Sequence, residues 1–275
     1  MPLVARMLRM DADSVSPGGG AEIRHILTLP QGDLTHAVCP AGQVSPTHHL
    51  PELQEQYYVL AGVGEIWRAT DEREAATTLR PGRWAEMPAG MRFQFRSDRG
   101  VALVFLVAVL PSWRSDLFHT IADGAWDAGA PAQMPLTDAA ALVEDWLSGD
   151  FDWGGRTEVP QTPPIDPIGS LQQGGLANWR LEAGTCSMAV RHQAVSQLWY
   201  VISGHGELWR ANGDGDQSVT LLWPGVGFDI PAGTDFQVRA SGQEALRVVL
   251  LSMPRHTQAA GPEHTTGPWE AGSVR

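Results

Sequence analysis

The amino-acid sequence repeats itself, and this duplication constrains the fold more than any other feature. Residues 55–68 read EQYYVLAGVGEIWR and residues 197–210 read QLWYVISGHGELWR, 142 positions later. The segment 88–96, PAGMRFQFR, returns 143 positions later as PAGTDFQVR at 231–239. A constant period over this length predicts two copies of one structural unit. A tail containing Trp126 returns with Trp269, so we predict domains at 1–130 and 131–275.

Each copy has the pattern of an all-β domain. Short apolar or alternating runs are separated by turn residues, and the chain contains 30 Gly and 20 Pro, which suits strands joined by tight turns. In the first copy, strands are predicted at 23–29, 34–39, 57–60, 64–69, 78–79, 84–87, 92–96 and 101–110. Between the copies we predict one helix at Thr137–Ser148 and an irregular, proline-rich linker at Gly154–Pro167.

Composition excludes several classes of function. All 19 basic residues are Arg, and without lysine neither Schiff-base catalysis nor pyridoxal phosphate attachment is available. A net charge of -12 argues against nucleic acid and anionic membranes as partners. Cys39 and Cys186 occupy non-equivalent places in the copies and predict reduced thiols. With no apolar run long enough for a signal peptide or a membrane span, the expected location is cytoplasmic.

Glycine, histidine and acidic residues in both halves are spaced as in a known family. Gly42 is followed after five residues by His48, and Glu55 lies seven positions before the Gly62-Val63-Gly64 turn. Pro88-Ala89-Gly90 follows about 25 residues later. This pattern resembles the two signature motifs of the cupin superfamily, and its recurrence resembles a bicupin. The resemblance implies two tandem barrels of the double-stranded β-helix, or jelly-roll, type with the helical, proline-rich linker between them.

The resemblance also implies a metal site built from two histidines, a glutamate and a third histidine. The matching positions are His48, Leu50, Glu55 and Phe93 in the first half, and Val190, His192, Gln197 and Phe236 in the second. Neither set is complete, so we expect no cofactor. His49 leaves one alternative open: with a strand register slipped by one residue, His48, His49 and Glu55 would hold Fe, Mn, Ni or Zn in the N-terminal barrel.

Aromatic residues at the vacated positions favour an organic ligand. Phenylalanine replaces the third histidine in both halves, and Tyr57 and Trp199 follow the Glu55 and Gln197 positions at the same strand parity. These rings either fill the barrels or line a pocket for a partly apolar molecule. The predicted ligand-binding residues are His49, Phe93, His192, Gln197, Trp199 and Phe236.

The surviving polar residues of the first barrel suit acid–base chemistry. His48 and Glu55 in a dry pocket would exchange protons with a substrate, and Tyr57 would donate to a developing oxyanion. We therefore predict a metal-independent isomerase, cyclase or dehydratase with His48, Glu55 and Tyr57 as catalytic residues, placed by family habit in bacterial secondary-metabolite biosynthesis. The alternatives are a metal-dependent cupin oxygenase using His48, His49 and Glu55, and a non-catalytic small-molecule-binding bicupin.

Repeated polar residues outside this set suggest an interface. By strand parity Gln94 and Arg96, like Gln237 and Arg239, face outward, which predicts pairing of the barrels within the chain or of two chains in a homodimer. His25 and His36 are expected on the surface or in loops.

Overall fold

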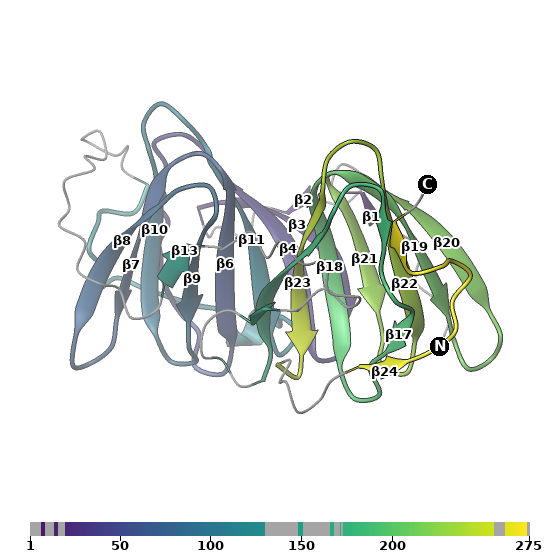
Figure 1. Ribbon diagram of the computed structural model, residues 1–275. Coiled ribbons are helices and arrows are strands. Elements are labelled where there is room, and N and C mark those ends of the chain that lie inside the picture. Colours follow the sequence, from purple (N-terminus) through teal and green to yellow (C-terminus); the bar gives the residue numbers. More distant parts are fainter. Residues whose placement is uncertain are drawn as a thin grey trace. The chain divides into compact units, whose positions relative to one another are not determined.

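The computed structural model describes residues 7–8, 14–15, 20–129, 148–150, 166–167, 171, 173–255 and 262–273. The chain divides into an N-terminal unit, Ala12–Phe151, and a C-terminal unit, Met1–Asp11 with Asp152–Arg275. Each unit contains two antiparallel sheets, and Figure 1 labels many of their strands. The all-β prediction is confirmed.

The N-terminal unit contains a seven-stranded sheet, in the order β13-β9-β6-β11-β4-β3-β2, and a five-stranded sheet, in the order β12-β5-β10-β7-β8. Its strands are β2 (Ser14–Val15), β3 (Glu22–Leu29), β4 (Gly32–Cys39), β5 (Thr47–His49), β6 (Gln54–Ala61), β7 (Gly64–Ala69), β8 (Glu74–Leu79), β9 (Arg83–Met87), β10 (Arg92–Ser97), β11 (Leu103–Leu110), β12 (His119–Ile121) and β13 (Ser148–Asp150). A 3₁₀ turn at Ser115–Leu117 precedes β12.

The C-terminal unit repeats this arrangement with sheets β1-β21-β18-β23-β15-β14 and β20-β19-β22-β16-β25, and β17 pairs with β22 and β24. Its strands are β1 (Met7–Leu8), β14 (Asp166–Pro167), β15 (Gly175–Leu181), β16 (Thr185–Cys186), β17 (Val190–Arg191), β18 (Ser196–Ser203), β19 (His205–Ala211), β20 (Gln217–Leu222), β21 (Val226–Ile230), β22 (Asp235–Ser241), β23 (Leu246–Met253), β24 (Glu263–His264) and β25 (Gly272–Ser273).

The predicted strands of the first copy are all present, with ends displaced by a few residues. The short strand β5, which carries His48, was not predicted, because three residues give no measurable alternation. The predicted helix at Thr137–Ser148 lies outside the described residues except for Ser148, which begins β13. Most of the predicted linker is likewise outside them, and its last two residues, Asp166 and Pro167, form β14 rather than irregular chain.

Two short strands depart from the predicted domains 1–130 and 131–275. β1 lies in the first range but pairs with β21 of the C-terminal unit. β13 lies in the second range but pairs with β9 of the N-terminal unit, as Figure 1 shows. The repeat in the sequence does not reveal these two edge strands, because segments of two or three residues are too short to add a detectable signal to it.

The repeated Gly-x-Gly turn has a backbone requirement in both copies. Gly62 and Gly204 have φ values of 81°, in the left-handed region that favours glycine. A Cβ atom at Gly62 would lie 1.9 Å from the carbonyl oxygen of Ala102, and one at Gly204 would lie 2.4 Å from that of Ala245. Any larger residue at either glycine would therefore push its turn away from the segment that contains Ala102 or Ala245.

The outward-facing residues predicted to form an interface are used inside their own unit. Gln94 is buried, and its amide nitrogen donates to the carbonyl oxygens of Ser45 and Trp126 at 2.8 and 2.7 Å. Its carbonyl accepts from the Trp126 backbone at 2.9 Å, while Arg96 covers the Trp126 ring and pairs with Glu65. The interface interpretation is therefore wrong for Gln94, which fastens the repeated tail to the barrel.

The second copy fastens its tail in the same way. The Gln237 side chain donates a hydrogen bond to the Trp269 carbonyl at 2.8 Å and accepts one from the Trp269 backbone nitrogen at 3.1 Å. Arg239 lies 4.5 Å from the Trp269 ring centre.

The C-terminal unit also contains a buried ion pair. Arg210 contacts Asp229 at 2.6 Å, and each side chain is 2% exposed.

The described residues contain no helix long and apolar enough to cross a membrane. Cys39 and Cys186 are both free, in agreement with the prediction of reduced thiols, and both are buried.

Candidate functional site

A cavity of about 270 Å³ lies inside the N-terminal unit. Its wall is largely apolar and aromatic, with a few polar groups from β3, β4, β5 and β6. The lining residues are Ala21, Ile23, His25, Thr35, His48, Glu55, Tyr57, Phe95, Phe105, Val107, Val109, Trp113 and Phe118. All three predicted catalytic residues, His48, Glu55 and Tyr57, therefore line one cavity.

Strand pairing explains why Glu55 and Tyr57 share this wall. They stand two residues apart on β6, so their side chains leave the same face of the sheet. On the neighbouring strand β11, Val109 pairs with Glu55 and Val107 pairs with Tyr57, and both valines line the cavity. The carboxyl group of Glu55 is consequently surrounded by hydrocarbon on its own sheet.

This environment changes the acidity of Glu55. Burial raises the pKa of the Glu55 carboxyl from 4.5 to about 7, against the opposing effect of a hydrogen bond from the Tyr57 hydroxyl. Burial, followed by the charge of Glu55, raises the pKa of Tyr57 well above its usual value. Near neutral pH, the cavity therefore contains a carboxyl group that both binds and releases a proton, next to a phenol that stays protonated.

His48 is enclosed by phenylalanine rings. Its ring centre lies 5.0 Å from that of Phe93 and 5.6 Å from that of Phe95, with near-parallel planes, and the edge contact with Phe118 measures 5.2 Å. Phe93 thus packs on His48 and is not part of the cavity wall, whereas Phe95, two residues further along β10, is. The aromatic ring that β10 contributes to the pocket is therefore that of Phe95, the next inward-facing residue after the predicted Phe93.

Ten of the thirteen lining residues were not among the predicted site residues. Trp113 and Phe118 come from the tail after β11, and Thr35 comes from β4. His25 was expected on the surface; it is exposed, but its ring also lines the cavity 6.4 Å from that of Trp113. The only sequence signal for the tail was its repetition, which does not show that it covers the pocket. His36, also expected on the surface, is buried.

The donors expected for a metal do not come together. His49 follows His48 on β5, is half-buried and does not line the cavity, as alternation along a strand requires. Leu50 and Phe93, at two of the four expected ligand positions, belong to the hydrophobic core. Across the part of the chain that the structure describes, no group of three or more His, Cys, Asp or Glu is arranged to hold a metal ion. The side chains present therefore do not fit the metal site that the fold resemblance implies.

The equivalent positions in the C-terminal unit form a packed interior. Trp199 is fully buried, and its indole nitrogen donates to the Gln197 side chain at 2.9 Å, in the place of the Tyr57–Glu55 bond. The Trp179 and Phe228 rings lie 5.1 and 5.4 Å from Trp199. This unit replaces an ionisable pair with a neutral one.

The other two ligand-binding residues predicted in this unit lie in the same interior. His192 and Phe236 are both buried, and their rings stack 5.9 Å apart. Phe236 also meets Trp199 edge to face at 5.9 Å.

Comparison with known proteins bears on the fold. No family model matches this sequence, and no curated protein matches it. Solved structures of oxalate decarboxylase from Bacillus subtilis do match. The structure at pH 4.6 has a TM-score of 0.70 at 13% identity and covers 94% of this chain and 78% of that one. For a tryptophan-to-tyrosine variant the TM-score is 0.71 at 12% identity, and the match covers 94% of this chain and 79% of that one. For an arginine-to-alanine variant the TM-score is 0.72 at 13% identity, and the match covers 96% of this chain and 80% of that one. At this identity the match shows the fold alone: the chain has the all-β architecture of two tandem cupin-type barrels.

Proposed function

We propose that the N-terminal unit is a metal-independent enzyme that moves protons on a small organic molecule, with Glu55 as the central acid–base group. The observation that carries this proposal is a carboxyl group with a pKa near 7 facing a largely apolar cavity. General acid–base catalysis works best when the pKa of the group lies near the working pH. The cavity, at about 270 Å³, is slightly below the range of about 300–1,000 Å³ typical of small-molecule sites, so a compact substrate is expected.

The first step is removal of a proton from a carbon next to a carbonyl group. Ionised Glu55 takes the proton, the C–H electron pair becomes the carbon–carbon double bond of an enolate, and the carbonyl oxygen gains the negative charge. Glu55 is then neutral, so its hydrogen bond from Tyr57 is no longer assisted by charge. The Tyr57 hydroxyl becomes free to donate to the enolate oxygen. The two groups thus act in sequence on the same proton transfer.

Three outcomes follow from this one intermediate. Return of the proton to a different position gives isomerisation, loss of a β-hydroxyl group as water gives dehydration, and attack of the enolate carbon on an internal electrophile gives ring closure. His48, held between phenylalanine rings on the same cavity wall, serves as the second proton carrier for the departing or returning proton. Measuring the shared first step tests all three.

That step is visible as exchange of α-hydrogens for deuterium in D₂O, followed by proton NMR on small ketones. Wild-type protein is expected to accelerate exchange of ketones that bind, and Glu55→Gln is expected to abolish it. Glu52→Gln, which makes the same change at an exposed position, is the matched control and should leave exchange unaltered. Ketones that bind without exchanging would identify a binding protein and overturn the proposed activity.

Metal content tests the other part of the proposal. Protein purified without chelator and then offered Fe, Mn, Ni and Zn should retain far less than one equivalent by plasma mass spectrometry. Near one equivalent, lost on His48→Ala or Glu55→Gln, would contradict the metal-independent mechanism and favour the oxygenase alternative.

A further inference from the structure

We infer that the N-terminal cavity selects an uncharged, flat, ring-containing carbonyl compound and rejects carboxylates. The inference rests on the proposed function, because it names the substrate class of the same site. It follows from three features of the cavity: the sign of its charged groups, the arrangement of its rings, and the role of Glu55 as a base.

The cavity wall, as far as the structure describes it, offers no fixed positive charge to an anion. Among the described residues no arginine lines it, and the sequence contains no lysine. Its titratable side chains are Glu55, Tyr57 and the two imidazoles of His25 and His48. A carboxylate entering this space would bring a second negative charge close to Glu55 in a poorly solvated environment, where like charges repel strongly.

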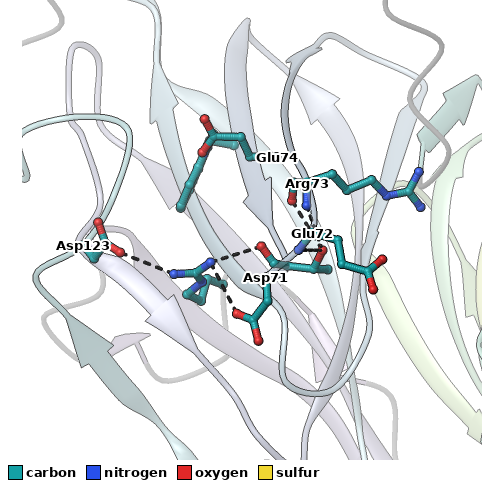
Figure 2. Close-up of polar contacts among 8 residues, drawn as sticks. Asp71, Glu72, Arg73, Glu74 and Asp123 are labelled. Carbon is teal, nitrogen blue, oxygen red and sulfur yellow. Dashed lines mark hydrogen bonds and ion pairs between the residues drawn. The ribbon is translucent and has the colours of Figure 1, made fainter.

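Arginines on neighbouring strands are engaged outside the cavity. Arg92, on β10, reaches Asp123 at 3.3 Å and Asp71 at 3.8 Å, at the charged tip of the β7–β8 hairpin drawn in Figure 2. Arg96, on the same strand, pairs with Glu65. Neither side chain belongs to the cavity wall, so neither supplies the bidentate contact by which arginine recognises a carboxylate.

The aromatic wall favours a flat ring. Phe95 and Phe105 meet at 73° with centres 5.5 Å apart, and Tyr57 stacks on Phe105 at 4.7 Å. Phe118 and Trp113 contribute further ring surface from the tail. Rings at these mutual angles present both faces and edges, which is how aromatic groups pack with a further ring.

An ammonium group is attracted to ionised Glu55, but it suits the proposed chemistry poorly. Its positive charge pairs with the carboxylate and lowers the pKa of Glu55, which weakens this group as a base. A neutral carbonyl compound avoids this conflict as well as the repulsion that a carboxylate meets.

The test compares two probes of similar size, acetophenone and benzoate. Their dissociation constants are measured by ligand-observed NMR at about pH 8. Acetophenone is expected to bind at least about tenfold more tightly than benzoate. In Glu55→Gln, benzoate should gain about tenfold or more while acetophenone changes less than about threefold. Trp113→Ala, at a side chain 36% exposed, should weaken acetophenone binding without unfolding the unit. Equal or tighter binding of benzoate, or no binding of either probe, would overturn the inference.

A matched pair of ketones separates this inference from the proposed activity. Acetophenone and 4-acetylbenzoate share the exchangeable methyl ketone and differ by one carboxylate. Selective binding of acetophenone without deuterium exchange would sustain the substrate class and refute the catalytic proposal. Faster exchange of 4-acetylbenzoate, lost in Glu55→Gln, would refute the substrate class and sustain the catalytic proposal.

Discussion

Replacing Glu55 by glutamine should make the protein more stable at alkaline pH and leave it nearly unchanged at acidic pH. The carboxyl group is 9% exposed and is surrounded by apolar side chains. In the C-terminal unit the equivalent position already holds a glutamine, Gln197, which accepts a hydrogen bond from Trp199 at 2.9 Å. The amide of the variant accepts from Tyr57 in the same manner, so the substitution removes a buried charge while retaining the bond.

The size of the effect follows from the pKa of Glu55 in the folded state. Burial raises that pKa from 4.5 to about 7. A group with a raised folded-state pKa contributes stability that is fully present below the unfolded value and is lost as the pH rises through the folded value. At about 1.4 kcal/mol for each pKa unit, the loss between about pH 4.5 and pH 7 is about 3 kcal/mol. Glu55→Gln does not undergo this loss.

The assay is thermal unfolding of wild type and Glu55→Gln at about pH 4.5 and about pH 8.5. The midpoints should agree at the lower pH, and the variant should unfold about 6–12 °C higher at the upper pH. Glu52→Gln, the exposed control, should follow wild type at both. A shift of equal size at both pH values would refute the reasoning, because it would show that the charge of Glu55 carries no cost in the fold.

Three further predictions concern Tyr57, the tail and the buried ion pair. Tyr57→Phe removes the hydrogen bond that lowers the pKa of Glu55, so the alkaline shift of the Glu55 carboxyl, followed by infrared difference spectroscopy, should increase. Gln94→Ala leaves the buried tail contacts of Trp126 unpaired and should cost about 2–4 kcal/mol in urea unfolding, with faster proteolysis near Trp126. Asp229→Asn removes the carboxylate that neutralises the buried Arg210 charge and should cost about 3–5 kcal/mol in the same assay.

Each of these has a control at a comparable residue. Tyr58→Phe changes the neighbouring tyrosine on β6, which does not line the cavity, and should leave the Glu55 carboxyl unaltered. Gln193→Ala changes an exposed glutamine and should cost less than about 0.5 kcal/mol. Replacing both members of the ion pair, Arg210→Met with Asp229→Leu, should recover much of the loss. An Asp229→Asn variant as stable as wild type would show that the pair contributes nothing.

The three predicted catalytic residues of the candidate site could be placed because strand parity is local. Glu55 and Tyr57 were placed on one wall from their spacing of two, and His48 from the glycine motif that precedes it; all three line the cavity. Parity also explains why His49, which was predicted to bind a ligand, does not line the cavity. The same reasoning failed for Gln94: facing away from the barrel interior is not the same as facing solvent when a tail covers that side.

The sequence by itself determined the duplication, the strands of the first copy along the chain, and three polar groups inside the first barrel, those of His48, Glu55 and Tyr57. These follow from local periodicity, turn chemistry and a constant spacing between copies. Only the tertiary structure decided that Trp113 and Phe118 complete the cavity, that Phe93 packs on His48 instead of facing a ligand, and that Trp199 sits within a packed interior. These outcomes depend on how side chains from distant strands share one enclosed volume, and pairwise packing of that kind leaves no periodic signal in the chain.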